Sequence, residues 1–111
     1  MQVVTIFQNI RETETPFFKD VSYILQRIKE GKNQDLVKKI RQEKNKTKRN
    51  DLKKNLPAIC FSGQFNKRSD SALVEHSGLI CLDFDGYKKK KELLEDKEKF
   101  QKNKFVFSVF V

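Results

Sequence analysis

Two aspartates, separated by one residue, follow an apolar run in the last third of the chain. The run begins after Gly78 with Leu79–Leu82, Asp83 and Asp85 follow on either side of Phe84, and Gly86 ends it. A short apolar run bounded by glycines is typical of a buried strand, and strand side chains alternate between faces, so both carboxylates should share one face, with Phe84 on the other. Burying two ionised carboxylates unpaired is costly, and a divalent cation would offset that cost. The spacing therefore favours a Mg²⁺ or Mn²⁺ site shared with substrate phosphates. The alternative is a turn at Asp85, with Asp83 capping a neighbouring element.

The charge balance of the chain indicates a polyanionic partner. The 111 residues include 24 Lys and Arg against 15 Asp and Glu, a formal net charge of +9. This excess favours nucleic acid first and an anionic membrane surface second. The alternative is a Lys-rich surface that is merely solvated.

Seven basic residues are candidates for binding phosphate. Four consecutive lysines at the start of a predicted helix oppose the helix dipole, so a triphosphate or a template backbone explains them better than helix stability does. Two more lie in the basic segment 44–54, and an arginine follows the second predicted strand, where its planar guanidinium matches phosphate or carboxylate groups. For each of them an ordinary surface position is the alternative. They are Lys88, Lys89, Lys90, Lys91, Lys48, Arg49 and Arg68.

The apolar spacing predicts the elements that position these residues. Asp20 should cap a helix that Gly31 ends, and further helices should span about 34–44, 47–56 and 88–102. The predicted strands are 2–7, 58–62 (ended by Gly63), 78–85 and 105–111. We therefore expect one α+β domain over residues 1–111, in which a helix-rich N-terminal unit packs on a small mixed sheet of 58–62, 78–85 and 104–111. The acids should lie at the carboxyl end of the middle strand.

The cysteines and the hydropathy indicate a cytoplasmic protein. Cys60 and Cys81 each lie within an apolar run, so we expect reduced, buried core residues. With one histidine and no Cys-x-x-Cys pair, a zinc site is not expected. No apolar run reaches about 18 residues, the length of a membrane span, so the chain is not expected to cross a membrane, and nucleic acid rather than a membrane is the expected partner.

Several stretches read together resemble a known family. They are Thr13–Phe17, Leu56–Phe65, Arg68 and His76–Asp85. Together they resemble the N-terminal domain of virulence-associated protein E-like proteins and of phage or mobile-element replication proteins, which is similar to primase-polymerases of the archaeo-eukaryotic type. The resemblance implies an RRM-like palm in which Asp83 and Asp85 are catalytic ligands of Mg²⁺ or Mn²⁺. It also implies DNA replication by nucleotidyl transfer, with a DNA or RNA template, nucleoside triphosphates and a replicative helicase as partners.

The resemblance also implies that this chain is an incomplete catalytic unit. The family's later motifs, a Ser-x-His element and a third acidic ligand, are not found among these residues. The sequence ends within the apolar run 105–111, so we expect a domain truncated at its C-terminus and an isolated chain without activity.

Two other functions fit parts of the same sequence. The first is a non-catalytic basic module that binds nucleic acid or docks a helicase. The second is a phosphatase, because Asp83-Phe84-Asp85-Gly86 resembles the first motif of haloacid dehalogenase-like enzymes, in which the first Asp is the nucleophile and the second the acid/base. Tyr87 departs from that motif, and 26 residues after Asp85 leave no room for the later ones.

Overall fold

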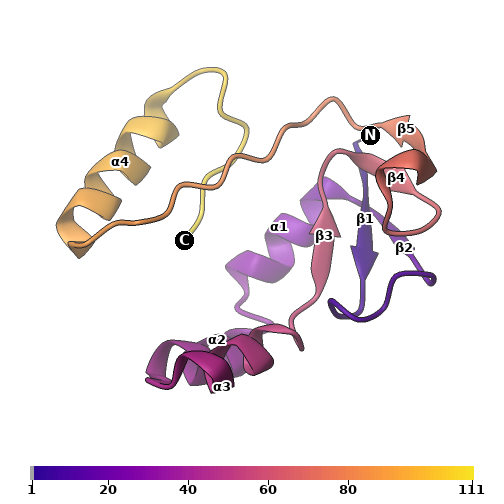
Figure 1. Cartoon of the computed structure of the whole chain (residues 1–111). Coiled ribbons are helices and arrows are strands. Elements are labelled where there is room, and N and C mark those ends of the chain that lie inside the picture. The colour runs from indigo at the N-terminus through magenta and orange to yellow at the C-terminus, as the bar shows by residue number, and fades with distance from the viewer. Residues whose placement is uncertain (1) are drawn as a thin grey trace. The chain divides into compact units, whose positions relative to one another are not determined.

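A three-stranded antiparallel sheet with the N-terminal strand at its centre organises the first part of the α+β chain. The computed structural model describes residues 2–111 (Figure 1). Residues up to Cys81 form one compact unit, the N-terminal unit, and Leu82–Val111 form a second, the C-terminal unit. The elements are β1 (Val3–Phe7), β2 (Phe17–Asp20), α1 (Val21–Lys29), α2 (Gln34–Gln42), α3 (Lys46–Lys53), β3 (Ala58–Cys60), β4 (Gly63–Phe65), β5 (Leu73–His76) and α4 (Lys90–Lys102).

Strand β1 lies between two antiparallel neighbours. The sheet order is β2-β1-β3, with Val4 opposite Lys19 and Ile6 opposite Ile59. Val4 and Phe7 are fully buried, and Val4 packs with two residues of α1 in the core. Both sheets pair antiparallel, so the predicted mixed sheet is wrong in its strand direction.

The predicted central strand 78–85 is not a strand in the structure. Of its apolar residues, Leu79 packs on the core of the N-terminal unit, whereas Ile80 and Leu82 are exposed. The run has the composition of a strand, but a strand also requires a partner for its backbone hydrogen bonds. Among residues 2–111 the central position of the three-stranded sheet is occupied by β1, which pairs with one strand on each edge.

Local signals placed the helices of the N-terminal unit correctly. The Asp20 carboxylate accepts hydrogen bonds from the Ser22 backbone N–H at 2.9 Å and from the Ser22 hydroxyl at 2.7 Å. These bonds hold the pKa of Asp20 below its ordinary value. Gly31, at φ +66°, follows the helix, and its N–H donates to the Ile28 carbonyl at 3.1 Å, as in a Schellman motif. The predicted helices at 34–44 and 47–56 are confirmed as α2 and α3.

A second, two-stranded sheet follows directly after β3. Gly63 was predicted to end a strand, but it begins β4, which pairs with β5. The buried Thr5 hydroxyl donates to the Gly63 carbonyl at 2.7 Å and accepts from the Phe65 N–H at 2.9 Å. The central strand of the first sheet is thereby fastened to the second sheet.

The C-terminal unit consists of α4 and irregular backbone on each side of it. The helix confirms the prediction for 88–102 with a start at Lys90. Of its predicted inner positions, Leu93 and Phe100 are half-buried, but Leu94 is 49% exposed. The predicted strand 105–111 is wrong: these residues have no strand partner among residues 2–111, and Phe105 is 85% exposed.

The cysteines divide between a covered and an open position. Cys60, on β3, is half-buried, and burial raises the pKa of its thiol, an effect that Arg68 partly opposes. Cys81 is exposed, so the prediction of two inaccessible thiols is wrong for this residue. Cys81 lies in the part of the apolar run 78–85 that has no strand partner and that the core of the N-terminal unit does not cover.

Candidate functional site

The two acids of the Asp-x-Asp motif lie on irregular backbone at the start of the C-terminal unit. Asp83 and Asp85 are both exposed, and neither forms a hydrogen bond or an ion pair with any of residues 2–111. Gly86 follows at φ +76°, a left-handed conformation that favours glycine, so the chain turns directly after the second acid. The carboxylates are therefore presented to solvent from a short segment rather than from a strand face.

Two aromatic contacts attach this segment to α4. The rings of Phe84 and Phe100 have centroids 4.9 Å apart at an interplanar angle of 31°. The Tyr87 hydroxyl donates to Asp96 Oδ2 at 2.6 Å, and this bond is the main reason that the pKa of Tyr87 is raised. Asp96 and Phe100 are four residues apart and share one helix face. The side chain between the two acids is thus held by the helix, while the acids on either side of it remain open.

The sequence prediction missed Tyr87 and Asp96. From the sequence, Tyr87 is only a departure from a phosphatase motif, and Asp96 is one of many charged residues on a polar helix. The available signal was the pair of aromatic residues at 84 and 87, whose spacing let both side chains reach one face of the helix that follows.

The four consecutive lysines surround the first turn of α4. Lys88 and Lys89 precede the helix, and Lys90 and Lys91 are its first two residues, all of them exposed. The Lys91 ammonium lies 4.0 Å from a Glu95 carboxylate oxygen, a contact at the limit of an ion pair. No side chain caps this end of the helix. The lysines therefore oppose the dipole of a helix that has no side-chain cap.

The carboxylates of Asp83 and Asp85 are suitable ligands for a hard divalent cation. Two carboxylates are the kind of ligand that Mg²⁺ and Mn²⁺ take, with water and phosphate oxygens completing the shell. Residues 2–111 contain no group of three or more His, Cys, Asp or Glu placed to hold a metal ion. Any ion held here would thus take only two of its ligands from these side chains.

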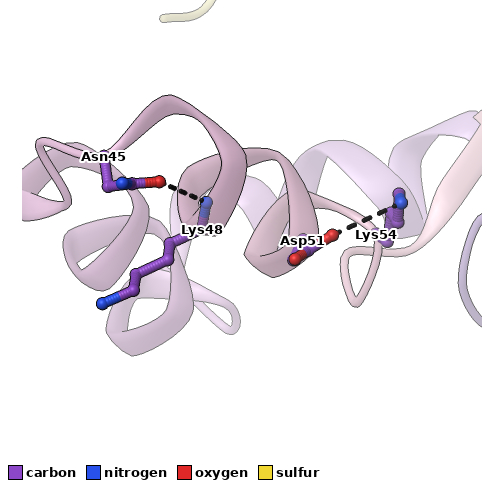
Figure 2. A network of polar contacts seen from close by, with 4 residues as sticks. All are labelled: Asn45, Lys48, Asp51 and Lys54. Carbon is purple, nitrogen blue, oxygen red and sulfur yellow. Dashed lines mark hydrogen bonds and ion pairs between the residues drawn. The ribbon is translucent and has the colours of Figure 1, made fainter.

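The other predicted phosphate-binding residues belong to the N-terminal unit. Arg68 is exposed on the loop after β4, where its backbone N–H donates to the Thr13 carbonyl at 2.9 Å. Lys48 and Arg49 are neighbours on α3. Asn45 caps this helix by accepting from the Lys48 backbone N–H at 3.0 Å, and the Lys48 ammonium extends away from that contact (Figure 2).

Lys48 also lines a hollow of about 560 Å³ on the N-terminal unit. Arg49 is half-buried and its guanidinium donates to the Glu43 carbonyl at 3.5 Å. The hollow contains both signs of charge, and its lining residues are Arg11, Glu43, Lys48, Asp51, Leu52 and Asn55.

Comparison with known protein families gives a match over the second half of the chain. The family described as BT4734-like, N-terminal domain, matches residues 51–111, which include Arg68, both acids and the four lysines. No curated protein and no solved structure matched the chain. Among residues 2–111, no helix has both the length and the apolar character needed to cross a membrane. Because the match covers more than half of the sequence, the chain belongs to the family of BT4734-like N-terminal domains.

Proposed function

We propose that this chain supplies the first metal-binding motif of a replication protein of the primase-polymerase type. Asp83 and Asp85 would hold Mg²⁺ or Mn²⁺ beside the phosphates of a nucleoside triphosphate, on a DNA or RNA template. The observation that carries the proposal is the state of the two carboxylates, which are exposed and unpaired among residues 2–111 although the chain has nine more cations than anions.

The surroundings of the acids support a role in binding phosphates. Phe84 is held against α4, so the carboxylates on either side of it have a defined support rather than a free loop. Lys88–Lys91 follow within a few residues and can meet the negative charge of a triphosphate or template strand. A bound divalent ion would neutralise phosphate charge and orient the groups that react. With only two carboxylates present, we expect catalysis to require additional ligands.

The resemblance extends the proposal to the cellular setting. We propose a cytoplasmic protein of a phage or mobile element that works with a replicative helicase.

Metal binding tests the proposal directly. We expect the chain to bind Mn²⁺ weakly, and we expect Asp83→Asn combined with Asp85→Asn to abolish that binding while the thermal melt stays the same, because neither side chain has a partner to lose among residues 2–111. The matched control is Asp35→Asn combined with Asp70→Asn, which removes the same charge from exposed positions in the N-terminal unit. Equal Mn²⁺ binding by the wild type and the Asp83/Asp85 variant would refute the proposed site.

A non-catalytic nucleic-acid-binding module is the second candidate. The observation that favours it is the position of Lys88–Lys91, at a helix end where they oppose the dipole and where no side-chain cap compensates. Oligonucleotide affinity that falls steeply with salt, but does not respond to Mn²⁺ or to the Asp83/Asp85 substitutions, would support the module over the enzyme.

A further inference from the structure

Most of the net charge of the chain is concentrated in one helical hairpin. Residues 38–54 cover most of α2, the connection to α3, α3 itself and the residue after it, and we call this segment the basic hairpin. It contains nine Lys and Arg against two carboxylates, those of Glu43 and Asp51, and therefore contributes +7 of the formal +9. All other residues together are nearly balanced in charge.

The cations of the basic hairpin face solvent and have few anionic partners. Arg49 is half-buried and bonded to a backbone carbonyl, and the other eight are exposed. Among residues 2–111, the ion pair of this segment joins the Lys54 ammonium to Asp51 Oδ1 at 3.4 Å (Figure 2). The exposed cations are Lys38, Lys39, Arg41, Lys44, Lys46, Lys48, Lys53 and Lys54.

This concentration of charge does not stabilise the fold. Helices α2 and α3 have nine and eight residues, lengths at which an isolated helix is marginal in water. Packing holds them, through the buried Ile40 and the half-buried Val37 and Leu52. Like charges on neighbouring turns repel one another, so the cations oppose this packing. A bound polyanion would remove the repulsion.

We propose that the basic hairpin binds the phosphodiester backbone of double-stranded nucleic acid. Residues 34–56 contain no aromatic side chain, so the helices lack the aromatic platforms on which single-stranded bases usually stack. Their apolar residues are buried or half-buried, so no apolar face is available to enter a membrane. The inference rests on the proposed function, because it takes the nucleic-acid template of that function as the ligand of the basic hairpin. It does not depend on the metal site.

A pair of charge-matched variants of the full chain tests this inference. The hairpin variant carries four exposed changes, Lys39→Gln, Lys44→Gln, Lys46→Gln and Lys48→Gln. The control removes the same charge elsewhere in the N-terminal unit, with Lys19→Gln, Lys29→Gln, Lys32→Gln and Lys67→Gln. Glutamine is a good helix former, so circular dichroism should show both variants folded. Fluorescence anisotropy with a labelled random-sequence duplex then gives the affinity at salt concentrations between about 50 and 200 mM.

We expect the hairpin variant to lose at least about tenfold in duplex affinity and its plot of log affinity against log salt to become shallower by about 2 to 4, since each phosphate contact contributes roughly 0.9. The control should keep most of the wild-type slope. Three results would overturn the inference: equal losses in both variants, tighter binding to a single strand than to the duplex, or binding to phosphatidylserine vesicles but not to the duplex. Mn²⁺ binding at Asp83 and Asp85 should survive in the hairpin variant, so that failure of the metal site and failure of this surface can be distinguished.

Discussion

The hydroxyl of Thr5 should contribute more to stability than its size suggests. Thr5 is fully buried in the central strand β1, and its hydroxyl bonds to both ends of β4. Replacement by valine keeps the shape of the side chain and leaves no cavity. It removes the donor to the Gly63 carbonyl and the acceptor for the Phe65 N–H, so both backbone groups lose their partner.

The magnitude follows from the burial of those two groups. A buried polar group that loses its partner costs about 1–3 kcal/mol. Gly63 is buried and Phe65 is half-buried, so the second loss should fall at the low end. We therefore expect Thr5→Val to lower the free energy of unfolding by about 2–4 kcal/mol. The matched control, Thr5→Ser, keeps the hydroxyl and deletes one methyl group, for about 1 kcal/mol.

Urea unfolding followed by far-ultraviolet circular dichroism measures this difference. Thr5→Val should lower the midpoint strongly without changing the slope of free energy against urea, because the surface exposed on unfolding stays the same. Thermal melts should fall by about 10 °C or more, since 1 kcal/mol corresponds to roughly 4–8 °C in a domain of this size. If valine is tolerated as well as serine, the two hydrogen bonds do not hold the second sheet to the first.

Three further predictions concern other parts of the chain. Gly63→Ala should destabilise the protein by at least about 2 kcal/mol in urea unfolding, because a Cβ there would lie 2.1 Å from a carbonyl oxygen of β5; a wild-type midpoint would contradict the close approach. Maleimide should label the exposed Cys81 much faster than Cys60, whose pKa is raised by burial, and equal rates near pH 8 would contradict this difference. The pKa of Tyr87 is raised above 10.0 by its bond to Asp96, so this contact should persist below pH 10 and be lost as pH rises through the folded-state value. The difference in phenolate absorbance between the wild type and Tyr87→Phe should show that midpoint, and a midpoint at or below 10 would be inconsistent with the bond.

The features predicted correctly from the sequence are those that a few neighbouring residues determine. Asp20 caps α1 through a residue two positions away, and Gly31 ends the same helix with a backbone hydrogen bond that reaches back three residues. The α+β class followed in the same way, because helical spacing and β-rich runs are both local. Such interactions need no knowledge of the tertiary structure.

The features that could not be predicted depend on distant partners. The runs 78–85 and 105–111 have the composition of strands, but a run becomes a strand only where it finds a partner. The central position of the three-stranded sheet is occupied by β1 instead. The Thr5 bonds join residues about 60 positions apart, and a threonine within a strand gives no sign of them. The Tyr87–Asp96 contact depends on where α4 begins, and helix boundaries are the least certain part of a pattern.

The exposure of the acids changes the physical argument for a metal site. On a buried strand, a cation would be needed to make two adjacent carboxylates tolerable. In the structure both are exposed, so water already solvates them and folding does not require an ion.

The case for a cation then depends on what the two carboxylates can do together with a ligand. Two carboxylates leave most positions around a Mg²⁺ ion to other oxygens, and triphosphate oxygens are suitable ligands. Binding of ion and triphosphate at Asp83 and Asp85 should therefore be reciprocal, each strengthening the other by the same factor. We therefore expect the proposed site to stay nearly empty until its substrate arrives, with its acids supported by the contact of Phe84 with α4 rather than by the ion.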